Sequence, residues 1–303
     1  MKLLFNFLVF PGFLFTAVAG MLASWIDRKV TARVQWRVGP PWYQNFADFV
    51  KLLGKEIIVP KTSRWIFLLA PLLGLASVTL VATLLGMTFL RPQGSFIGDV
   101  IVVLYLLTIP AIAVIIGGSS SANPLASIGV SREMKLVLAY ELPFVLAILV
   151  AVIKTGGALR IGQVISYQIH SGSVWYSISG IIAFIVAILC MQAKLGYVPF
   201  DAAEAEQEIM AGPYIEYSGA PLAVFKLTRQ MLLVTLPLFL IALFWAHTYS
   251  VLWIIIKYVV LLVIIVLLKN TNARLKIGQA TRFFWGPMTI LALISVVLAL
   301  LGY

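Results

Sequence analysis

Cysteine and histidine are nearly absent from this sequence of 303 residues, which contains one cysteine, Cys190, and two histidines, His170 and His247. There is no CxxC pair, no HExxH motif and no cluster of these residues able to ligate iron, zinc, haem or an iron–sulfur centre. We therefore expect no metal site and no catalytic residue in this chain. Any redox chemistry has to belong to a partner subunit.

Charged residues are also scarce, at 11% of the chain, while 62% of the residues are hydrophobic and the mean hydropathy is +1.04. A soluble fold cannot bury so much apolar surface, so the composition predicts an integral membrane protein. The net charge of +11 does not indicate a nucleic-acid partner. The basic residues lie between long apolar runs, which is the pattern of basic loops on the inner side of a membrane.

Eight apolar runs are long enough to cross about 30 Å of hydrocarbon as helices. They predict an all-α fold, with residues 1–303 forming a single polytopic membrane domain. The first run is too long to be a typical signal peptide and lacks a small-residue cleavage site, so we expect a retained helix. The predicted spans lie near 3–25, 66–90, 100–118, 136–153, 175–193, 221–245, 251–268 and 285–302.

Lysine and arginine are distributed unevenly between the two sets of connections. Alternating the spans places fifteen of them in one set and four in the other, with eight in the connection after the first span. Because basic loops stay in the cytoplasm, we expect that set inside and both termini outside. The four external residues are Lys2, Arg91, Lys154 and Arg160.

The first internal connection contains a helical pattern of apolar residues. Apolar positions recur at the spacing of one helix face, opposite polar positions, which predicts an amphipathic helix on the inner membrane surface. The apolar positions are Phe46, Phe49, Val50, Leu53 and Ile57, and the polar ones are Gln44, Asp48, Lys51 and Lys55.

Glu141 is the first of the few ionisable residues that composition alone does not explain. It lies about five residues inside the predicted fourth span, next to Pro143, which removes a backbone donor and favours a kink. A charge at this depth is costly, so we expect a buried, proton-exchanging carboxyl. The alternative is a glutamate at a helix end that reaches back to the interface or pairs with Lys135.

An acidic connection follows the fifth span, although the other internal connections are basic. If this segment is helical, Asp201, Glu204 and Glu208 share one face and Glu206 points elsewhere. A capping box explains Asp201 and Glu204 but leaves the other acids unexplained. Crowded carboxylates raise one another's pKa, which predicts a proton reservoir. Its members are Asp201, Glu204, Glu206, Glu208 and Glu216.

Three further basic residues lie within the predicted spans. Lys226 and Arg229 lie one helical turn apart, just after the acidic connection, and are natural partners for its carboxylates, with snorkelling to the interface as the alternative. Lys257 lies near the outer surface, where we expect it to snorkel outward.

Three segments carry a resemblance to a known family. Residues 27–40 resemble the E-R-K and Q-x-R-x-G-P segment that follows the first helix in the H-type membrane subunit of respiratory complex I. Residues 46–60 resemble its A-D-x-x-K-L-x-x-K-E stretch, and residues 199–219 resemble its P-F-D-x-x-E-x-E and E-Y-S-G loop. The resemblance covers most of the chain and implies the same helix count.

The chain departs from the quinone-using members of that family after Pro40. The stretch from Pro41 to Asn45 is shorter and lacks their glycine-rich, arginine-containing sequence, and Asp27 replaces a glutamate. In this respect the chain is more similar to the subunits of membrane-bound nickel–iron hydrogenases and ferredoxin-dependent sulfur reductases. The alternatives are a quinone-site subunit of complex I and, less favoured, a free-standing secondary transporter.

The resemblance implies a membrane anchor that couples a peripheral redox arm to ion transport in the cytoplasmic membrane of a prokaryote. The implied partners are hydrogenase-like large and small subunits, which carry the nickel–iron centre and iron–sulfur clusters, together with antiporter-like membrane subunits and lipid. Implied ion-path residues are Glu141, Asp201, Glu204, Glu206, Glu208, Glu216, Lys226 and Arg229. Implied docking residues are Arg28, Lys29, Arg33, Arg37, Asp48, Lys51 and Lys55.

Overall fold

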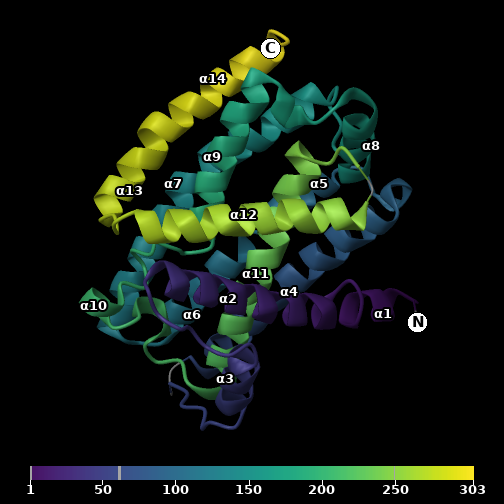
Figure 1. The fold of residues 1–303 in the computed structure, drawn as a ribbon. Helices are drawn as coiled ribbons and strands as arrows, with labels where there is room; N and C mark the ends of the chain where they lie inside the picture. Colours follow the sequence, from purple (N-terminus) through teal and green to yellow (C-terminus); the bar gives the residue numbers. More distant parts are fainter. Residues whose placement is uncertain (1, 61–62, 249) are drawn as a thin grey trace.

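The computed structural model describes residues 2–60, 63–248 and 250–303, and all regular structure in these segments is helical (Figure 1). The first half contains α1 (Lys2–Leu8), α2 (Phe13–Val34), α3 (Gln44–Leu53), α4 (Arg64–Leu90), α5 (Asp99–Leu106), α6 (Ile109–Ser120) and α7 (Pro124–Lys154). The second half contains α8 (Ile161–Ser171), α9 (Ile178–Lys194), α10 (Glu206–Ile209), α11 (Gly219–Phe244), α12 (Val251–Thr271), α13 (Ile277–Phe283) and α14 (Thr289–Leu300).

Seven helical segments in the described chain are long and apolar enough to cross a membrane. The predicted span 175–193 corresponds to α9, which is apolar but has only 17 residues. The all-α, multi-pass membrane fold is therefore confirmed, with seven long helical segments and one shorter one in place of eight equal spans.

Two predicted spans are each divided into two helices at a proline. The first separates into α1 and α2 around Pro11, and α2 then continues to Val34, nine residues beyond the expected end. The third separates into α5 and α6, with Pro110 in the first turn of α6, where its missing N–H costs no hydrogen bond. Because α2 is long, Arg28, Lys29 and Arg33 lie on a helix and not in a loop.

The helix α7 begins twelve residues before the predicted span 136–153. The Asn123 side chain accepts a hydrogen bond from the Leu125 amide at its first turn, and the helix continues past Pro143 to Lys154. The charged residues near 132–135 are compatible with this helix, although they mark a loop in a hydropathy profile. Glu141 is consequently the eighteenth residue of a 31-residue helix, and its assignment to a helix end is wrong.

The last span also begins earlier than predicted, with α13 at Ile277. A π-helical turn over Phe284–Met288 contains Pro287 and joins α13 to α14. Proline has no N–H to donate to the preceding turn. The wider π-helical turn makes room for the proline ring, so the helix continues through this position.

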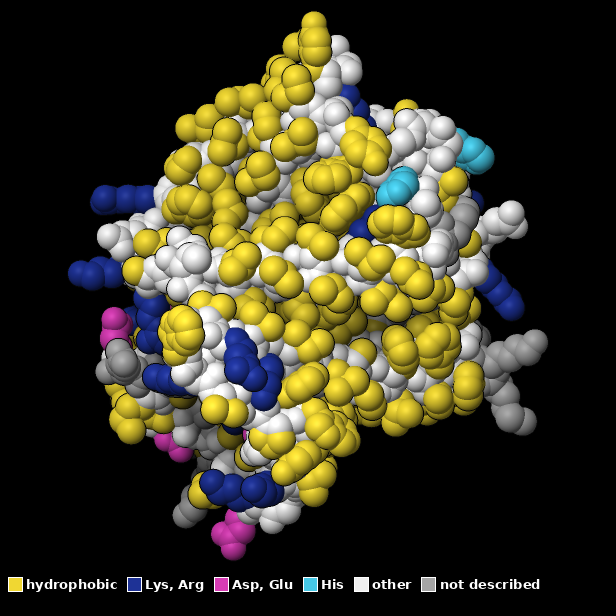
Figure 2. Space-filling view, viewed as in Figure 1, with side chains coloured by type: hydrophobic (Ala, Val, Ile, Leu, Met, Phe, Trp, Pro, Cys, Tyr) yellow, Lys and Arg dark blue, Asp and Glu magenta, His cyan; other side chains and the backbone are white. Residues whose placement is uncertain are grey.

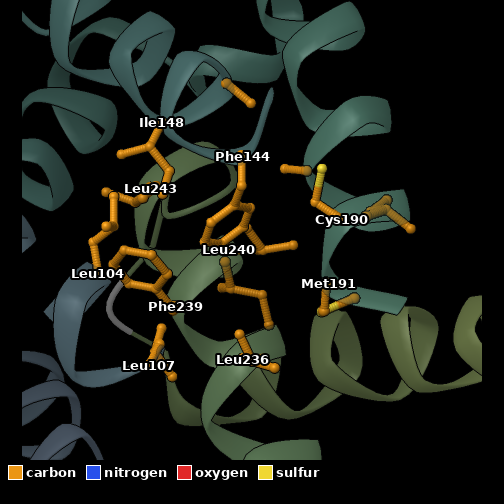
Figure 3. Packing of buried hydrophobic residues seen from close by; sticks show 14 of the residues in the cluster. Leu104, Leu107, Phe144, Ile148, Cys190, Met191, Leu236, Phe239, Leu240 and Leu243 are labelled. Carbon is orange, nitrogen blue, oxygen red and sulfur yellow. The ribbon is translucent and has the colours of Figure 1, made fainter. Parts of the chain in front are cut away.

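The core lies where α5, α7, α9 and α11 meet (Figure 3). Phe239 and Leu240 of α11 pack against Phe144 of α7 and Met191 of α9, and all four are completely buried. Cys190 is buried among the same residues and serves as a small apolar side chain.

The outer faces of the bundle remain apolar. Figure 2 shows hydrophobic side chains over most of the visible surface, with most basic and acidic groups on its left and lower parts. Exposed leucine, isoleucine, valine and phenylalanine occur along α1, α4, α12 and α14, which in a bilayer face hydrocarbon.

The predicted amphipathic helix in the first connection is confirmed as α3, but it ends at Leu53. Lys55 and Ile57 therefore lie beyond it. Phe46 and Phe49 pack against the core beside α2 and α11, whereas Val50 is 65% exposed. The side of α3 that carries Phe46 and Phe49 thus packs against the bundle, whereas the side that carries Val50 is exposed.

Candidate functional site

Five ion pairs lie where α2, α7, α9, α11 and α12 approach the loop from Leu195 to Ser218, and we refer to this region as the charged end. Each pair joins elements that are distant in sequence or separated by a turn. The pairs are Asp27–Lys269 at 2.9 Å, Arg132–Glu208 at 2.7 Å, Glu141–Lys194 at 2.7 Å, Asp201–Arg274 at 2.8 Å and Glu204–Arg229 at 2.6 Å.

The deepest pair joins Glu141 of α7 to Lys194 at the end of α9. The Lys194 side chain is 2% exposed, and its Nζ lies 5.1 Å from the ring centroid of Tyr140 and 5.0 Å from that of Phe144. The predicted alternative partner, Lys135, is wrong. The Oε1 atom of Glu141 is buried and has no hydrogen-bond partner among the described residues, so this carboxyl keeps one oxygen able to accept a proton or a water.

The acidic segment is not one helix. Residues 201–205 form turns, and only Glu206–Ile209 is helical, so the predicted common face of Asp201, Glu204 and Glu208 is wrong. Positive φ angles at Gly196 and Ala205 direct the chain into this path. The acids consequently meet three different cations instead of one another.

Arg229 of α11 holds this loop in place through hydrogen bonds. Its guanidinium donates to Glu204 and also to the carbonyls of Leu195, at 3.0 Å, and Gly196, at 2.6 Å. The predicted pairing of Arg229 with the acidic segment is therefore seen. Lys226, one turn away, is exposed and forms no ion pair with the acids that the structure describes.

The remaining acids of the segment lie apart. Glu208 is 64% exposed and pairs with Arg132, and Glu216 accepts a 2.5 Å hydrogen bond from Asn123, the residue that caps α7. Glu216 thus serves the fold of α7. Glu206 begins α10, but its side chain lies outside the described residues.

Two cavities connect these groups. One cavity of about 360 Å³ lies between α2, α11, α12 and the loop, and a smaller, partly open cavity of about 60 Å³ adjoins it. Asp201, Glu204 and Arg229 line both, so polar groups extend from one cavity to the other past the Glu204–Arg229 pair. The smaller cavity is large enough for water and also reaches Lys194.

Glu133 lines the smaller cavity and was not predicted from the sequence. It lies two turns before Glu141 on α7 and forms no ion pair with the described cations. A hydropathy reading assigns it to a polar connection, because Arg132 and Lys135 flank it. The available signal was its position eight residues before Glu141, which brings the two residues near one helix face.

Asp201 stands at the boundary between the two cavities, outside the membrane-spanning helices. Partial burial raises the pKa of its carboxyl above the usual range for aspartate, although Arg274 at 2.8 Å opposes this shift. Asp201 is thus easier to protonate than an exposed aspartate.

Asp27 extends the charged end to α2. It is 3% exposed and accepts from Lys269, whose Nζ lies 4.8 Å from the ring centroid of Tyr197. The Arg229 guanidinium lies 5.0 Å from the same ring. Tyr197 therefore bridges the Asp27–Lys269 and Glu204–Arg229 pairs, a connection that required the folded structure to be seen.

The predicted docking residues lie at the same end and are mostly accessible. Arg28 donates to Asn45 at 2.7 Å and approaches Asp48 at 3.5 Å, so these two docking residues are partly engaged with each other. Four others are exposed and form no ion pair with the described acids: Arg33, Arg37, Lys51 and Lys55. Lys29 is half-buried.

Among the described residues no group of three or more histidine, cysteine, aspartate or glutamate side chains is arranged to hold a metal ion. At the charged end, carboxyl groups lie beside cations and beside a cavity large enough for water.

Comparison with known proteins identifies the family. The family model described as NADH dehydrogenase matches residues 6–300. Formate hydrogenlyase subunit 4 of Escherichia coli is 31% identical over 93% of this chain and 95% of its own length. The H-type subunit of the NADH-quinone oxidoreductase of Carboxydothermus hydrogenoformans is 31% identical over 89% of this chain and 83% of its own.

Among solved structures, the chain is similar to one in the membrane-bound sulfane sulfur reductase, an archaeal respiratory membrane complex. The TM-score is 0.88 at 28% identity, with 99% of this chain and 100% of the other covered. The helical fold and these matches point to the same family. The chain belongs to the NADH dehydrogenase family of membrane subunits that includes the H-type subunit of complex I and formate hydrogenlyase subunit 4.

Proposed function

We propose that this chain is the membrane anchor and ion-path subunit of an energy-converting redox complex. Its relatives are subunits of multisubunit redox complexes, which supports a membrane subunit of this kind. The observation that supports the ion path is that the two cavities share Asp201 and Glu204, and that the smaller one is also lined by Glu133 and by Lys194, the partner of Glu141.

Protons would move along this path between carboxyl groups and water. Glu204 forms an ion pair with Arg229, whereas Glu133 has no described cation within ion-pair distance. A proton arriving at Asp201 would reach Glu133 through the water-sized cavity. Lys194 would then respond to the protonation of Glu141, because a protonated carboxyl no longer attracts the ammonium group.

The branch of the family that we favour is the one that contains hydrogenases and sulfur reductases. The end-to-end match with the sulfane sulfur reductase chain and the match to formate hydrogenlyase subunit 4 support it. Six of the eleven residues that line the larger cavity are charged, which suits water and ions better than an apolar quinone. A quinone-reducing complex I is the alternative, because relatives from NADH-quinone oxidoreductases reach the same 31% identity.

The proposed partners are hydrogenase-like large and small redox subunits and antiporter-like membrane subunits, in the cytoplasmic membrane of a prokaryote. Nickel–iron and iron–sulfur centres would belong to the redox subunits. Purification of the native complex tests this proposal. A nickel–iron-type large subunit supports the favoured branch, whereas tight binding of a quinone-site inhibitor assigns the chain to the alternative.

The ion path itself is tested with Glu141→Gln and Glu133→Gln in the whole complex. Each variant should assemble, reduce a soluble dye at the normal rate and lose most ion pumping in sealed vesicles, since glutamine keeps the shape but exchanges no proton. Glu56→Gln, at an exposed glutamate, is the matched control and should pump normally. Normal pumping by both cavity variants would remove this route from the mechanism.

A further inference from the structure

A hollow of a different kind lies at the opposite end of the bundle, beside the break between α1 and α2. A cavity of about 670 Å³ is lined by α1 and the end of α4, and one of about 330 Å³ is lined by α2, α4, α11 and α12. Phe10 and Leu90 line both, so the two form one trough. Figure 2 shows the surface recessed between the apolar side chains over α12 and those over α1.

The trough walls are mainly apolar, with Asn6 as a polar residue in the outer part. A Cβ atom placed on Gly86 would lie 2.3 Å from the Pro11 Cβ, so the α1–α2 break rests directly on α4 and forms the floor. The side chains around it are bulky: Leu4, Phe5, Leu8, Val9, Phe10, Phe15, Phe89, Leu238, Val251, Ile254 and Ile255. Water finds few hydrogen-bond partners there, so in a bilayer the occupant is hydrocarbon.

Arg91 stands at the mouth of the trough. It is the first residue after α4, which places it where a membrane-spanning helix reaches the interface. It is exposed and forms no ion pair with the described acids. A guanidinium in this position binds phosphate oxygens in a bidentate manner.

The depth of the trough fits one leaflet. Tyr258, at its inner end, is the eighth residue of α12, about 10 Å along the helix from Val251. An acyl chain that begins at a headgroup near Arg91 would extend toward the bilayer centre along this wall. A transmembrane helix, with a diameter of about 10–12 Å, packs best against small residues, whereas the trough is lined mainly by bulky ones.

We propose that this trough is a binding site for one phospholipid, with its phosphate on Arg91 and one acyl chain lying across Phe10 and Leu90 toward Tyr258. The site is independent of the ion path, because it lies on other residues at the other end of the bundle. It would hold a lipid between α1, α4 and α12, where these helices leave a gap that side chains do not fill.

The test is native mass spectrometry of the intact complex after extensive delipidation in detergent. The wild-type complex should retain one phospholipid. Arg91→Gln should lower its retention about tenfold, since a charge-assisted hydrogen bond is lost. Ala19→Phe, which fills the inner trough, should remove it. Lys154→Gln and Leu293→Phe, at the same end and on another lipid-facing helix, are the matched controls and should retain it.

These measurements test the lipid site without depending on the proposed function of the complex. Equal retention by wild type and both trough variants overturns it, and so does a retained amphiphile that contains no phosphate. Density for a partner subunit's helix in the trough of the native complex overturns it as well. Ion pumping is not the readout, so failure of the ion path leaves this test intact.

Discussion

At the scale of single residues, the charged end illustrates how buried charges are tolerated in a membrane. Lys194 and Arg229 each meet one carboxylate and also the faces of aromatic rings. These contacts replace part of the hydration that the cations lose on burial. The arrangement leaves one oxygen of Glu141 without a hydrogen-bond partner among the described residues, which is compatible with the proposed proton exchange.

Replacing Lys194 with methionine tests the strength of this pair. Lys194→Met should lower the thermal stability of the purified complex by an amount equivalent to about 3 kcal/mol, because the Glu141 carboxylate is left buried without its cation. Adding Glu141→Gln should recover most of the loss. Losses that simply add in the double variant would mean that the two side chains do not interact energetically.

Lys257 contradicts its predicted outward snorkelling. It is 2% exposed, and its Nζ donates to the Trp245 carbonyl at 2.5 Å and lies 2.8 Å from His247 Nδ1. It therefore stabilises the carboxyl end of α11. We expect Lys257→Met to cost about 1–3 kcal/mol in a melting experiment, since the Trp245 carbonyl loses its donor, while ion pumping by the assembled complex continues.

His247 makes the folding stability of the chain depend on pH. Burial, followed by the nearby Lys257 charge, lowers the pKa of His247 below its usual value. The unfolded chain then binds more protons than the folded chain near pH 6.5, so this group's contribution to stability is lost as pH falls through that region. A His247→Gln variant should show a smaller drop in melting temperature between pH 7.5 and about 5.5 than wild type. An unchanged difference between the two pH values would contradict this assignment.

At the scale of helices, the sequence predicts where apolar segments lie better than where they begin. Hydropathy locates all eight segments, because each must cover its backbone with apolar side chains in lipid. It misplaces the start of α7, because Arg132, Glu133 and Lys135 are polar although they lie on the helix. Arg132 pairs with Glu208 of the same chain, and Glu133 lines a cavity. It also treats α1–α2 and α5–α6 as single helices, although Pro11 and Pro110 divide them.

In the candidate site, too, some residues could be predicted from the sequence and others could not. Glu141, Asp201, Glu204 and Arg229 were found from the sequence because charges near apolar runs are conspicuous. The pairing of Arg229 with the acidic segment was predicted too, but Lys194 and Arg274 were not identified as the partners of Glu141 and Asp201, since they lie on other elements and only tertiary packing brings them together. Asp27 and Glu133 were missed for this reason too. Sequence patterns report position along the chain, whereas ion pairing depends on how helices cross.

The α2–α3 segment is where we expect a redox partner to dock. Arg33 and Arg37 are exposed and unpaired with described acids, while Arg28 is engaged with Asn45, so the first two are the better test. Arg33→Glu with Arg37→Glu should release the soluble redox subunits on purification and leave this chain in the membrane. Lys154→Glu with Arg160→Glu, at the other end, is the control. Full retention of the redox subunits would leave these arginines with a topological role alone.

At the scale of the whole molecule, the two ends of the bundle differ in chemistry. The ion pairs and both polar cavities lie at the charged end, whereas the opposite end carries Arg91, the apolar trough and the buried Lys257. This asymmetry matches the fifteen-to-four division of basic residues along the sequence. The proposed ion path at one end and the proposed lipid site at the other therefore rest on separate parts of one fold.

Orientation in the membrane follows from the same asymmetry and can be measured directly. Cysteines introduced at Lys55 and Ala273, at the charged end, should react with an impermeant maleimide only from the cytoplasmic side, since basic loops remain in the cytoplasm. Cysteines at Gln93 and Tyr303 should react only from outside. The native Cys190 is completely buried, so it adds little background, and Cys190→Ala in each variant removes it. Labelling of Lys55→Cys from outside would reverse the orientation and place the docking residues, the larger cavity and Glu204 away from any cytoplasmic redox partner.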